Sequence, residues 1–332
     1  MQTRSLSPSG PRVSALGLGC MGMSEFYGYA DHAESVATVH AALDAGITLL
    51  DTGDFYGMGA NELLLREALA GRRDGALISV KFGALRDPGG GWSGFDSRPA
   101  SVRNFLAMTL KRLGTDYIDI YRPSRLDPTV PIEDTVGAIA DMVKAGYVRH
   151  IGLSEVGADT IRRAVAVHPI VDLQIEYSLI SRGIEAEILP TCRALGVGIT
   201  AYGVLSRGLL SGNWSPATAP KGDGRAFAFP RFKGENLKKN QGIAATLAEI
   251  AAGHGATATQ VAFAWALSRG EHIVPLVGAR RRDRLREALG ALELQLSAAD
   301  LAEIEAAIPA DAAAGERYDA RGMSILDSER RT

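Results

Sequence analysis

The 332-residue chain has little cysteine, little net charge and no long apolar run. Two cysteines, Cys20 and Cys192, are too few for a disulfide framework, which favours a reducing compartment. A formal net charge of -2 provides no overall field that would attract nucleic acid or an anionic membrane. The first residues lack the apolar core of a signal peptide, and no apolar run reaches the ~18 residues of a membrane helix. We therefore expect a cytoplasmic protein with neither a nucleic-acid nor a membrane partner.

Three further absences narrow the function. The six histidines show no metal-ligand spacing, so no metal site is expected. The Gly-x-Gly-x-x-Gly pattern at 17–22 is not followed at once by a helical pattern, as a dinucleotide-binding strand–helix unit requires. We interpret it as the turn after the first strand. No Tyr-x-x-x-Lys occurs, which argues against the short-chain dehydrogenase design.

Short β-branched runs alternate with longer segments of helical period. The expected strands are 15–20, 48–53, 76–83, 117–122, 148–154, 171–177, 197–204 and 273–278. The expected helices are 33–45, 61–70, 101–113, 132–145, 158–167, 185–195, 241–269 (in one piece or two) and 281–291. Eight such units without a break in composition predict an α/β fold, a (β/α)8 TIM barrel of parallel strands. Residues 3–14 are expected to form a short hairpin that covers the bottom of the barrel.

Two long segments interrupt this alternation, residues 84–100 and 206–236. Both follow strands and therefore belong to the C-terminal face, where barrel enzymes carry their chemistry. Long loops in a compact domain are often lids or binding loops. We expect both, together with the tail 310–332, to shape a pocket, and residues 222–236 to fold over a bound cofactor.

Polar residues cluster at the ends of the expected strands. Asp51 ends the second strand, Tyr56 follows it closely, and Lys81 lies in the third. A buried ammonium near a phenol favours the phenolate and lowers its pKa, while a carboxylate keeps the ammonium charged. Such a tyrosine can act as a general acid toward a carbonyl oxygen. Taken singly, each residue has a structural alternative, because strand-end Asp often caps a turn and strand Lys often reaches solvent.

Specific motifs then identify a family. They are "DTGDFYG" at 51–57, "ISVKFG" at 78–83, "LKRLGTDYIDIY" at 110–121, "GLGCMGMS" at 17–24, "VRHIGLSE" at 148–155, "AYGVLSRGLLSG" at 201–212 and "LVGARRRDRLREALGAL" at 276–292. Together they resemble the aldo-keto reductase family from about residue 5 to residue 310. The resemblance implies one barrel domain over 1–332, with 310–332 as a C-terminal tail. It also implies that a small-molecule aldehyde or ketone is reduced with a nicotinamide cofactor, NADP(H) being preferred and NAD(H) possible.

Site residues follow from the same resemblance. It makes Tyr56 the general acid, Lys81 the residue that tunes its pKa and Asp51 the partner of Lys81. Tyr202 would stack on the nicotinamide ring. Ser154, Glu155 or a neighbour, and Gln174 would contact the carboxamide region. The full set of implied cofactor contacts is Met21, Gly22, Asp51, Ser154, Gln174, Tyr202, Gly203, Leu205, Arg207, Gly278, Ala279, Arg280, Arg284 and Glu287.

An arginine cluster supports the phosphate end of this cofactor site. Five arginines lie within residues 280–286, where the last expected strand leads into a helix. Cations at a helix N-terminus oppose the helix dipole, and a bound 2′-phosphate would offset that cost. We expect Arg280 and Arg284 to contact the cofactor, and Arg282 and Arg286 to form a solvated basic face.

One position departs from the family pattern. Alignment through Pro123 places Ser124 where the family usually has a histidine that hydrogen-bonds to the substrate carbonyl. A serine donates one hydrogen bond, reaches less far and does not titrate. Either Ser124 replaces the imidazole, or the site has opened for a bulkier or differently polarised substrate with Arg122 or Arg125 offering charge. In a third reading reduction is weakened, and the protein is an NADPH-binding sensor or regulatory subunit.

A different class of enzyme is also open at this point. A lysine in a barrel strand, here Lys81, can form a Schiff base as in class I aldolases. The arginine cluster and Tyr202 favour the nicotinamide reading over this one.

Overall fold

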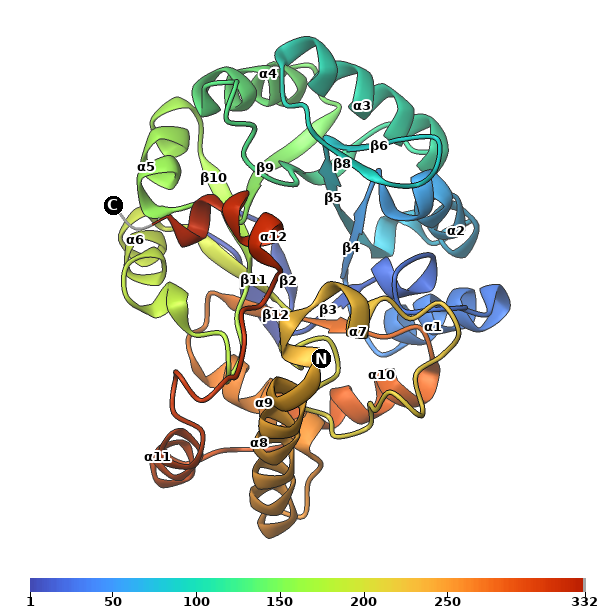
Figure 1. The fold of residues 1–332 in the computed structure, drawn as a ribbon. Coiled ribbons are helices and arrows are strands. Elements are labelled where there is room, and N and C mark those ends of the chain that lie inside the picture. Colours follow the sequence, from blue (N-terminus) through green and yellow to red (C-terminus); the bar gives the residue numbers. More distant parts are fainter. Residues whose placement is uncertain (331–332) are drawn as a thin grey trace.

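The structure is a computed structural model that describes residues 1–330. Eight parallel strands close into a barrel, confirming the predicted fold (Figure 1). In chain order they are β3 (Gly17–Gly19), β4 (Leu49–Gly53), β5 (Leu77–Phe82), β8 (Ile118–Pro123), β9 (Val148–Ser154), β10 (Ile170–Glu176), β11 (Gly198–Tyr202) and β12 (Ile273–Gly278). Each pairs with its neighbour in this order, and β12 closes the barrel against β3.

Helices surround this barrel as its outer layer (Figure 1). They are α1 (His32–Asp44), α2 (Ala60–Ala68), α3 (Pro99–Leu113), α4 (Ile132–Lys144), α5 (Ala158–Val167), α6 (Ile188–Leu195), α8 (Gly234–Gly253), α9 (Ala258–Ser268) and α10 (Arg282–Leu289). Glycines end several of them. Gly114 after α3 and Gly196 after α6 have φ of 66° and 68°, the left-handed conformation that glycine adopts without a steric penalty.

Two segments differ from the sequence prediction, while 241–269, expected as one helix or two, is two helices because Thr257 begins α9 with a capping box to Gln260. The first of the two, α8, already starts at Gly234, so the loop after β11 is shorter than expected. The segment 84–100 contains a hairpin, β6 (Ala84–Arg86) and β7 (Trp92–Phe95). Beyond the barrel, the chain adds α11 (Ala298–Ala307) and α12 (Ala320–Ser324).

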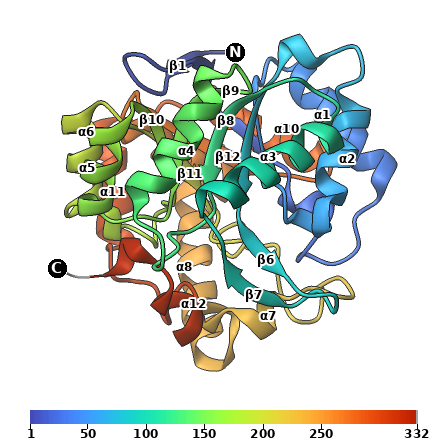
Figure 2. The ribbon, with the colours of Figure 1, turned by 90° about the horizontal axis from the view of Figure 1, so that it is seen from above.

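The two ends of the barrel are covered by different segments (Figure 2). The predicted N-terminal hairpin is confirmed as β1 (Thr3–Ser5) and β2 (Arg12–Ser14), and it closes the end where the strands begin. It packs so closely that a Cβ on Gly198 would lie 1.9 Å from the Leu6 carbonyl oxygen, so only glycine fits there. At the opposite end, which we call the barrel mouth, lie β6, β7, α7 (Arg225–Ala228) and α12.

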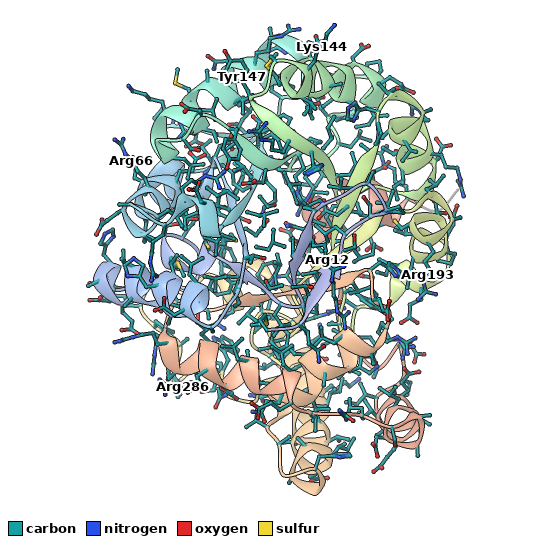
Figure 3. All side chains as sticks on the ribbon, turned by 180° about the vertical axis from the view of Figure 1, so that it is seen from behind. Arg12, Arg66, Lys144, Tyr147, Arg193 and Arg286 are labelled. Atoms are coloured by element: carbon teal, nitrogen blue, oxygen red, sulfur yellow. The ribbon has the colours of Figure 1, made fainter. Side chains whose placement is uncertain are left out.

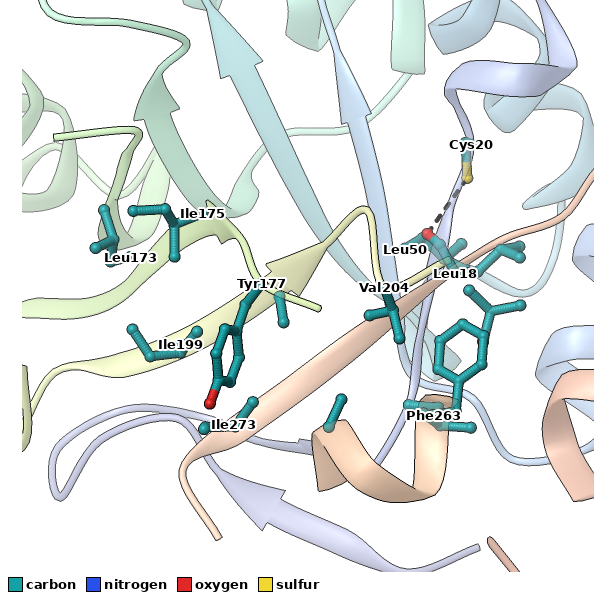
Figure 4. Packing of buried hydrophobic residues seen from close by; sticks show 14 of the residues in the cluster. Leu18, Cys20, Leu50, Leu173, Ile175, Tyr177, Ile199, Val204, Phe263 and Ile273 are labelled. Atoms are coloured by element: carbon teal, nitrogen blue, oxygen red, sulfur yellow. Dashed lines mark hydrogen bonds between the residues drawn. The ribbon is translucent and has the colours of Figure 1, made fainter. Parts of the chain in front are cut away.

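The apolar core is in two parts. The larger part joins strands to the outer helices, and Figure 4 shows Leu18, Ile199 and Phe263 within it. A smaller cluster lies at the hairpin end and consists of Leu6, Val13, Leu49, Ile120, Val171, Val274 and Leu276. Side chains two residues apart on a strand point the same way. Asp51 therefore shares the orientation of Leu49, and Arg122 that of Ile120, which places both charges above this cluster.

Charged side chains project outward from the ring of helices (Figure 3). Arg66, Lys144 and Arg286 are labelled there at the rim of the molecule. In the described part of the chain, no helix combines the length and the apolar character needed to cross a bilayer.

Candidate active site

The predicted Asp–Lys–Tyr set is brought together at the barrel mouth. Lys81 Nζ lies 2.5 Å from Asp51 Oδ2, and both side chains are only 5% exposed. Tyr56 begins the 3₁₀ turn η2 (Tyr56–Gly59) directly after β4, and the ammonium lies 5.0 Å from the centroid of its ring. The pair forms because β4 and β5 are neighbours in the barrel, with Gly53 opposite Lys81. A buried cation thus lies against the ring of a buried phenol.

Asp51 is held by two further donors. Its Oδ1 accepts hydrogen bonds from Ser79 Oγ at 3.0 Å and from Gln174 Nε2 at 2.7 Å. Hydrogen bonds to a carboxylate favour its charged form and fix its orientation. Gln174 therefore orients Asp51 in this structure, and its predicted contact with the cofactor carboxamide stays a prediction.

The pKa of Tyr56 differs from the expectation. Burial, followed by the charge of Asp51, raises the pKa of Tyr56 well above its ordinary value of 10. The expected lowering of this pKa is therefore wrong for the protein alone, because burial and the charge of Asp51 outweigh the groups that lower it. The role of Lys81 in tuning this pKa stays a prediction. Burial likewise lowers the pKa of Lys81, against the opposing attraction of Asp51. Tyr56 consequently keeps its proton, as a general acid must before reaction.

A second buried ion pair lies next to this set. Arg122 Nη1 lies 3.0 Å from Asp172 Oδ2, and neither side chain is exposed. Arg122 Nη2 also donates to Ser79 Oγ at 2.8 Å, which links the pair to Asp51. The idea that Arg122 offers charge to a substrate is therefore wrong, because its guanidinium is enclosed and paired. Arg122 lies two residues after Ile120 on β8, so its side chain points into the barrel as that of Ile120 does. This orientation could be read from the sequence, whereas the pairing with Asp172 could not.

Ser124 lies at the end of β8, where its backbone N–H donates to the Phe82 carbonyl oxygen at 2.8 Å. The side chain is buried, and its Oγ has no hydrogen-bond partner among residues 1–330. Ser154 Oγ, at the end of β9, is also buried without a partner in the same part of the chain. Unpaired buried hydroxyls are costly, so both are suited to a ligand that supplies the missing bond.

The C-terminal tail contributes residues that sequence reasoning missed. Arg317 donates to both carboxylate oxygens of Glu155, at 3.0 and 2.6 Å. Although burial opposes ionisation, this guanidinium holds the pKa of Glu155 well below its ordinary range. Glu155 Oε1 also accepts from the Tyr202 hydroxyl at 2.7 Å, and that hydroxyl lies 3.0 Å from the hydroxyl of Tyr318. No local pattern in the tail indicates these contacts, which join positions more than 100 residues apart.

The expected phosphate end lies at β12 and α10. Arg280 Nη1 donates to the Gly28 carbonyl oxygen at 2.9 Å, and Arg284 pairs with Glu287 at 3.0 Å. Arg282 pairs with Glu34 at the surface, as expected for the solvated basic face. A groove of about 380 Å³ opens nearby, lined by Met23, Ser24, Glu25, Phe26, Gly28, Tyr29, Ala30, Lys221 and Gly222. The groove therefore lies beside Gly28, whose carbonyl oxygen accepts the hydrogen bond from Arg280.

The other implied cofactor contacts lie in turns around the mouth. Met21 and Gly22 form the 3₁₀ turn η1 (Met21–Met23) after β3, as the sequence predicted. Gly203 and Leu205 belong to the turn after β11, Gly278 ends β12, and Ala279 follows it. Arg207 in the turn after β11 lies 3.0 Å from Glu176, a carboxylate that Arg231 and Arg317 also approach.

The segment expected to act as a lid packs across the mouth. Gly224 N donates to the Phe26 carbonyl oxygen at 3.0 Å, and the rings of Phe26 and Phe229 are 5.3 Å apart. The loop after β11 therefore meets the loop after β3.

The residues around the mouth fit a nicotinamide cofactor. Ser154 offers an unpaired hydroxyl for the carboxamide, and Arg280 and Arg284 offer cations for phosphate.

Replacing Asp54 with asparagine is expected to stabilise the protein at alkaline pH. Burial, and then the charge of Glu62, raise the pKa of Asp54 from 3.8 to about 8. A raised pKa in the folded state makes stability highest at low pH and lowers it as the pH rises toward 8. The variant should be more stable by roughly 2–4 kcal/mol at pH 8 and nearly unchanged at pH 4. Urea unfolding at both pH values measures this, with the exposed Asp44→Asn as control; equal differences at both would contradict it.

Comparison with known proteins places this geometry in a family. The model of the Aldo/keto reductase family matches residues 15–309. The "Probable aldo-keto reductase 1" of Glycine max is 42% identical over 320 residues, covering 96% of this chain and 92% of that protein.

Solved structures agree with this placement. The glycerol dehydrogenase AKR11B4 from Gluconobacter oxydans has a TM-score of 0.83 at 27% identity, covering 93% of this chain and 96% of that one. The holo form of the aldo-keto reductase AKR11C1 from Bacillus halodurans has a TM-score of 0.78 at 26% identity, covering 93% and 97%. The chain thus belongs to the aldo/keto reductase family, and NAD(P)H-dependent reduction of a carbonyl group is its class of reaction.

Proposed function

We propose that the protein is an active reductase that uses NADPH to reduce a small-molecule aldehyde or ketone in the cytoplasm, with Tyr56 as the proton donor. The observation that carries the proposal is the Lys81–Asp51 pair, which lies 2.5 Å apart against the ring of Tyr56. A weakened sensor would have no need of this buried and costly arrangement. The two buried free cysteines agree with a reducing compartment.

The residues of the chain divide the work as follows. The nicotinamide cofactor, when bound, supplies the hydride. Tyr56 holds its proton until negative charge develops on the carbonyl oxygen, and then transfers it. Lys81 stabilises the phenolate that remains, while Asp51 holds Lys81 in place. The unpaired hydroxyl of Ser124 is the second donor to the carbonyl oxygen in this proposal.

A preference for NADPH over NADH is proposed from the arginines at β12. A 2′-phosphate needs cations that can reach it, and guanidinium groups bind phosphate in a bidentate manner. Arg284 is 47% exposed, and its ion pair within residues 1–330 is with Glu287, three residues later on the same helix. Its charge is therefore accessible, whereas Arg207 is enclosed with Glu176.

The aldolase alternative loses support from the geometry. A Schiff base requires Lys81 to be a neutral, free amine, but its ammonium is bound to the Asp51 carboxylate. The test of the main proposal is a carbonyl panel in which NADPH and NADH consumption are followed separately. Turnover with a higher kcat/KM for NADPH supports it. Tight NADPH binding without turnover of any carbonyl would instead favour the regulatory reading.

Replacing Ser124 with alanine is expected to lower kcat by roughly 10- to 100-fold. The variant removes the donor proposed to stabilise charge on the carbonyl oxygen while leaving Tyr56 in place. Ser124→His should restore activity toward small aldehydes, since an imidazole can donate the same bond. Steady-state kinetics with NADPH measure both variants. An alanine variant with the kcat of the wild type would show that Ser124 takes no part in the reaction.

A further inference from the structure

The Arg125 guanidinium lies at the barrel mouth and has no carboxylate partner in the described chain. Its neighbours Arg207 and Arg317 each lie within 3.0 Å of a buried glutamate, and Arg231 lies 3.7 Å from Glu176. The Arg125 guanidinium instead donates to the Ser124 carbonyl oxygen at 2.6 Å and to the Tyr318 hydroxyl at 3.3 Å. Within residues 1–330, no carboxylate oxygen lies within 4.0 Å of it.

Its link to negative charge is indirect. Tyr202 donates its hydroxyl proton to Glu155, so in the 3.0 Å contact between the two tyrosines Tyr318 is the donor. Tyr318 in turn accepts from Arg125. Arg125 is thus joined to Glu155 through two hydroxyl groups, and this relay fixes the position of its guanidinium. Since a guanidinium carries five N–H donors, three remain without a partner in the described chain.

Arg125 directly follows Ser124, whose backbone N–H pairs with the carbonyl oxygen of Phe82, the residue after Lys81, so the guanidinium belongs to the same part of the mouth as the reaction centre. Burial and Asp51 raise the pKa of Tyr56, and Arg125 is the leading opposing charge. Ser124, next to it in the chain, is 2% exposed and has the unpaired Oγ described above. An anion bound to Arg125 would therefore lie beside the carbonyl that Tyr56 protonates.

The cofactor phosphates are excluded as that anion by topology. The barrel order is β10-β11-β12-β3-β4-β5-β8-β9, so β8 and β12 are separated by three strands in either direction. Arg125 follows β8, whereas the arginines proposed for the cofactor phosphate follow β12 on the opposite side of the barrel. The charge that satisfies Arg125 must come from another ligand.

We propose that Arg125 binds an oxyanion carried by the substrate, so that the preferred substrates are aldehydes or ketones bearing a carboxylate or phosphate group. This inference rests on the proposed reductase function and adds the substrate class. Tyr318 and Tyr202 are positioning residues in it, since they orient the guanidinium through the relay to Glu155. Arg125 has N–H donors without a partner in the described chain, and a substrate anion would accept hydrogen bonds from them on binding.

The kinetic test uses a matched pair of substrates, 4-carboxybenzaldehyde and its methyl ester, with NADPH at saturation. The wild type should prefer the carboxylate by at least about tenfold in kcat/KM. In Arg125→Met this preference should fall at least about tenfold, mainly through a higher KM, because the contact is made equally in the ground and transition states. Arg103→Met, an exposed arginine of α3, should leave the preference unchanged. A third substrate, 4-formylphenyl phosphate, shows by its kcat/KM whether phosphate is preferred to carboxylate.

A binding measurement separates this proposal from the reductase function. Calorimetric titration of the NADPH complex with the alcohol 4-(hydroxymethyl)benzoate should show weaker binding, by about tenfold or more, in Arg125→Met than in the wild type. Equal binding by both proteins, or an equal loss of kcat/KM on the acid and the ester, would overturn the anion subsite. Absence of turnover with every aldehyde would instead overturn the reductase function, while the titration would still decide whether Arg125 binds an anion.

Discussion

Tyr56→Phe is expected to lower kcat for aldehyde reduction by about 10²- to 10⁴-fold, the usual contribution of a general acid. The change removes one oxygen atom and keeps the ring that packs beside Lys81. Binding of NADPH should therefore persist, with a dissociation constant within about threefold of the wild type. Stopped-flow measurement of hydride transfer, together with fluorescence titration of NADPH, separates the two effects.

The pH dependence of the wild type provides an independent check on the same residue. Because burial and Asp51 raise the pKa of Tyr56 above 10, the acid form persists throughout the neutral and mildly alkaline range. The rate of reduction should not fall between about pH 7 and pH 9, since protonated Tyr56 is the active form. Full activity in Tyr56→Phe would remove this residue as the acid, whatever the pH profile.

The second large effect is expected on stability. Arg122→Met should lower the free energy of unfolding by about 3–5 kcal/mol, because it leaves the Asp172 carboxylate buried without its partner. Thr200 still donates to Asp172, but one hydroxyl does not replace a guanidinium. The loss should shrink at low pH, where Asp172 can be protonated in the folded state.

A double variant tests whether the uncompensated charge is the cause. Arg122→Met with Asp172→Leu removes both charges and should recover most of the lost stability, since buried ion pairs are often replaceable by apolar residues. Guanidinium chloride is unsuitable because it screens charge, so urea unfolding is the measurement. If the double variant is as unstable as the single one, the loss comes from packing and not from charge.

The expectations from sequence succeeded where neighbours in the chain or in the sheet decide the outcome. Residues 148–154 and 273–278 are β9 and β12 as predicted, because apolar period and flanking turns set a strand locally. The Lys81–Asp51 pair was foreseeable because consecutive parallel strands of a barrel lie side by side. The hairpin β6–β7 was missed, since its glycine-rich sequence carries little local preference for strand.

The sequence alone determined the barrel, the reaction class and the residues Asp51, Tyr56 and Lys81, because periodicity and motifs are properties of the chain. Only the tertiary structure decided the direction of the Tyr56 pKa, which depends on burial and on the nearby charge of Asp51. It likewise decided that Arg122 is enclosed with Asp172 while Arg125 has no carboxylate partner in the described chain. Which of two nearby arginines finds a counter-ion depends on side chains brought from distant strands and from the tail. No pattern in the chain itself encodes such a contact.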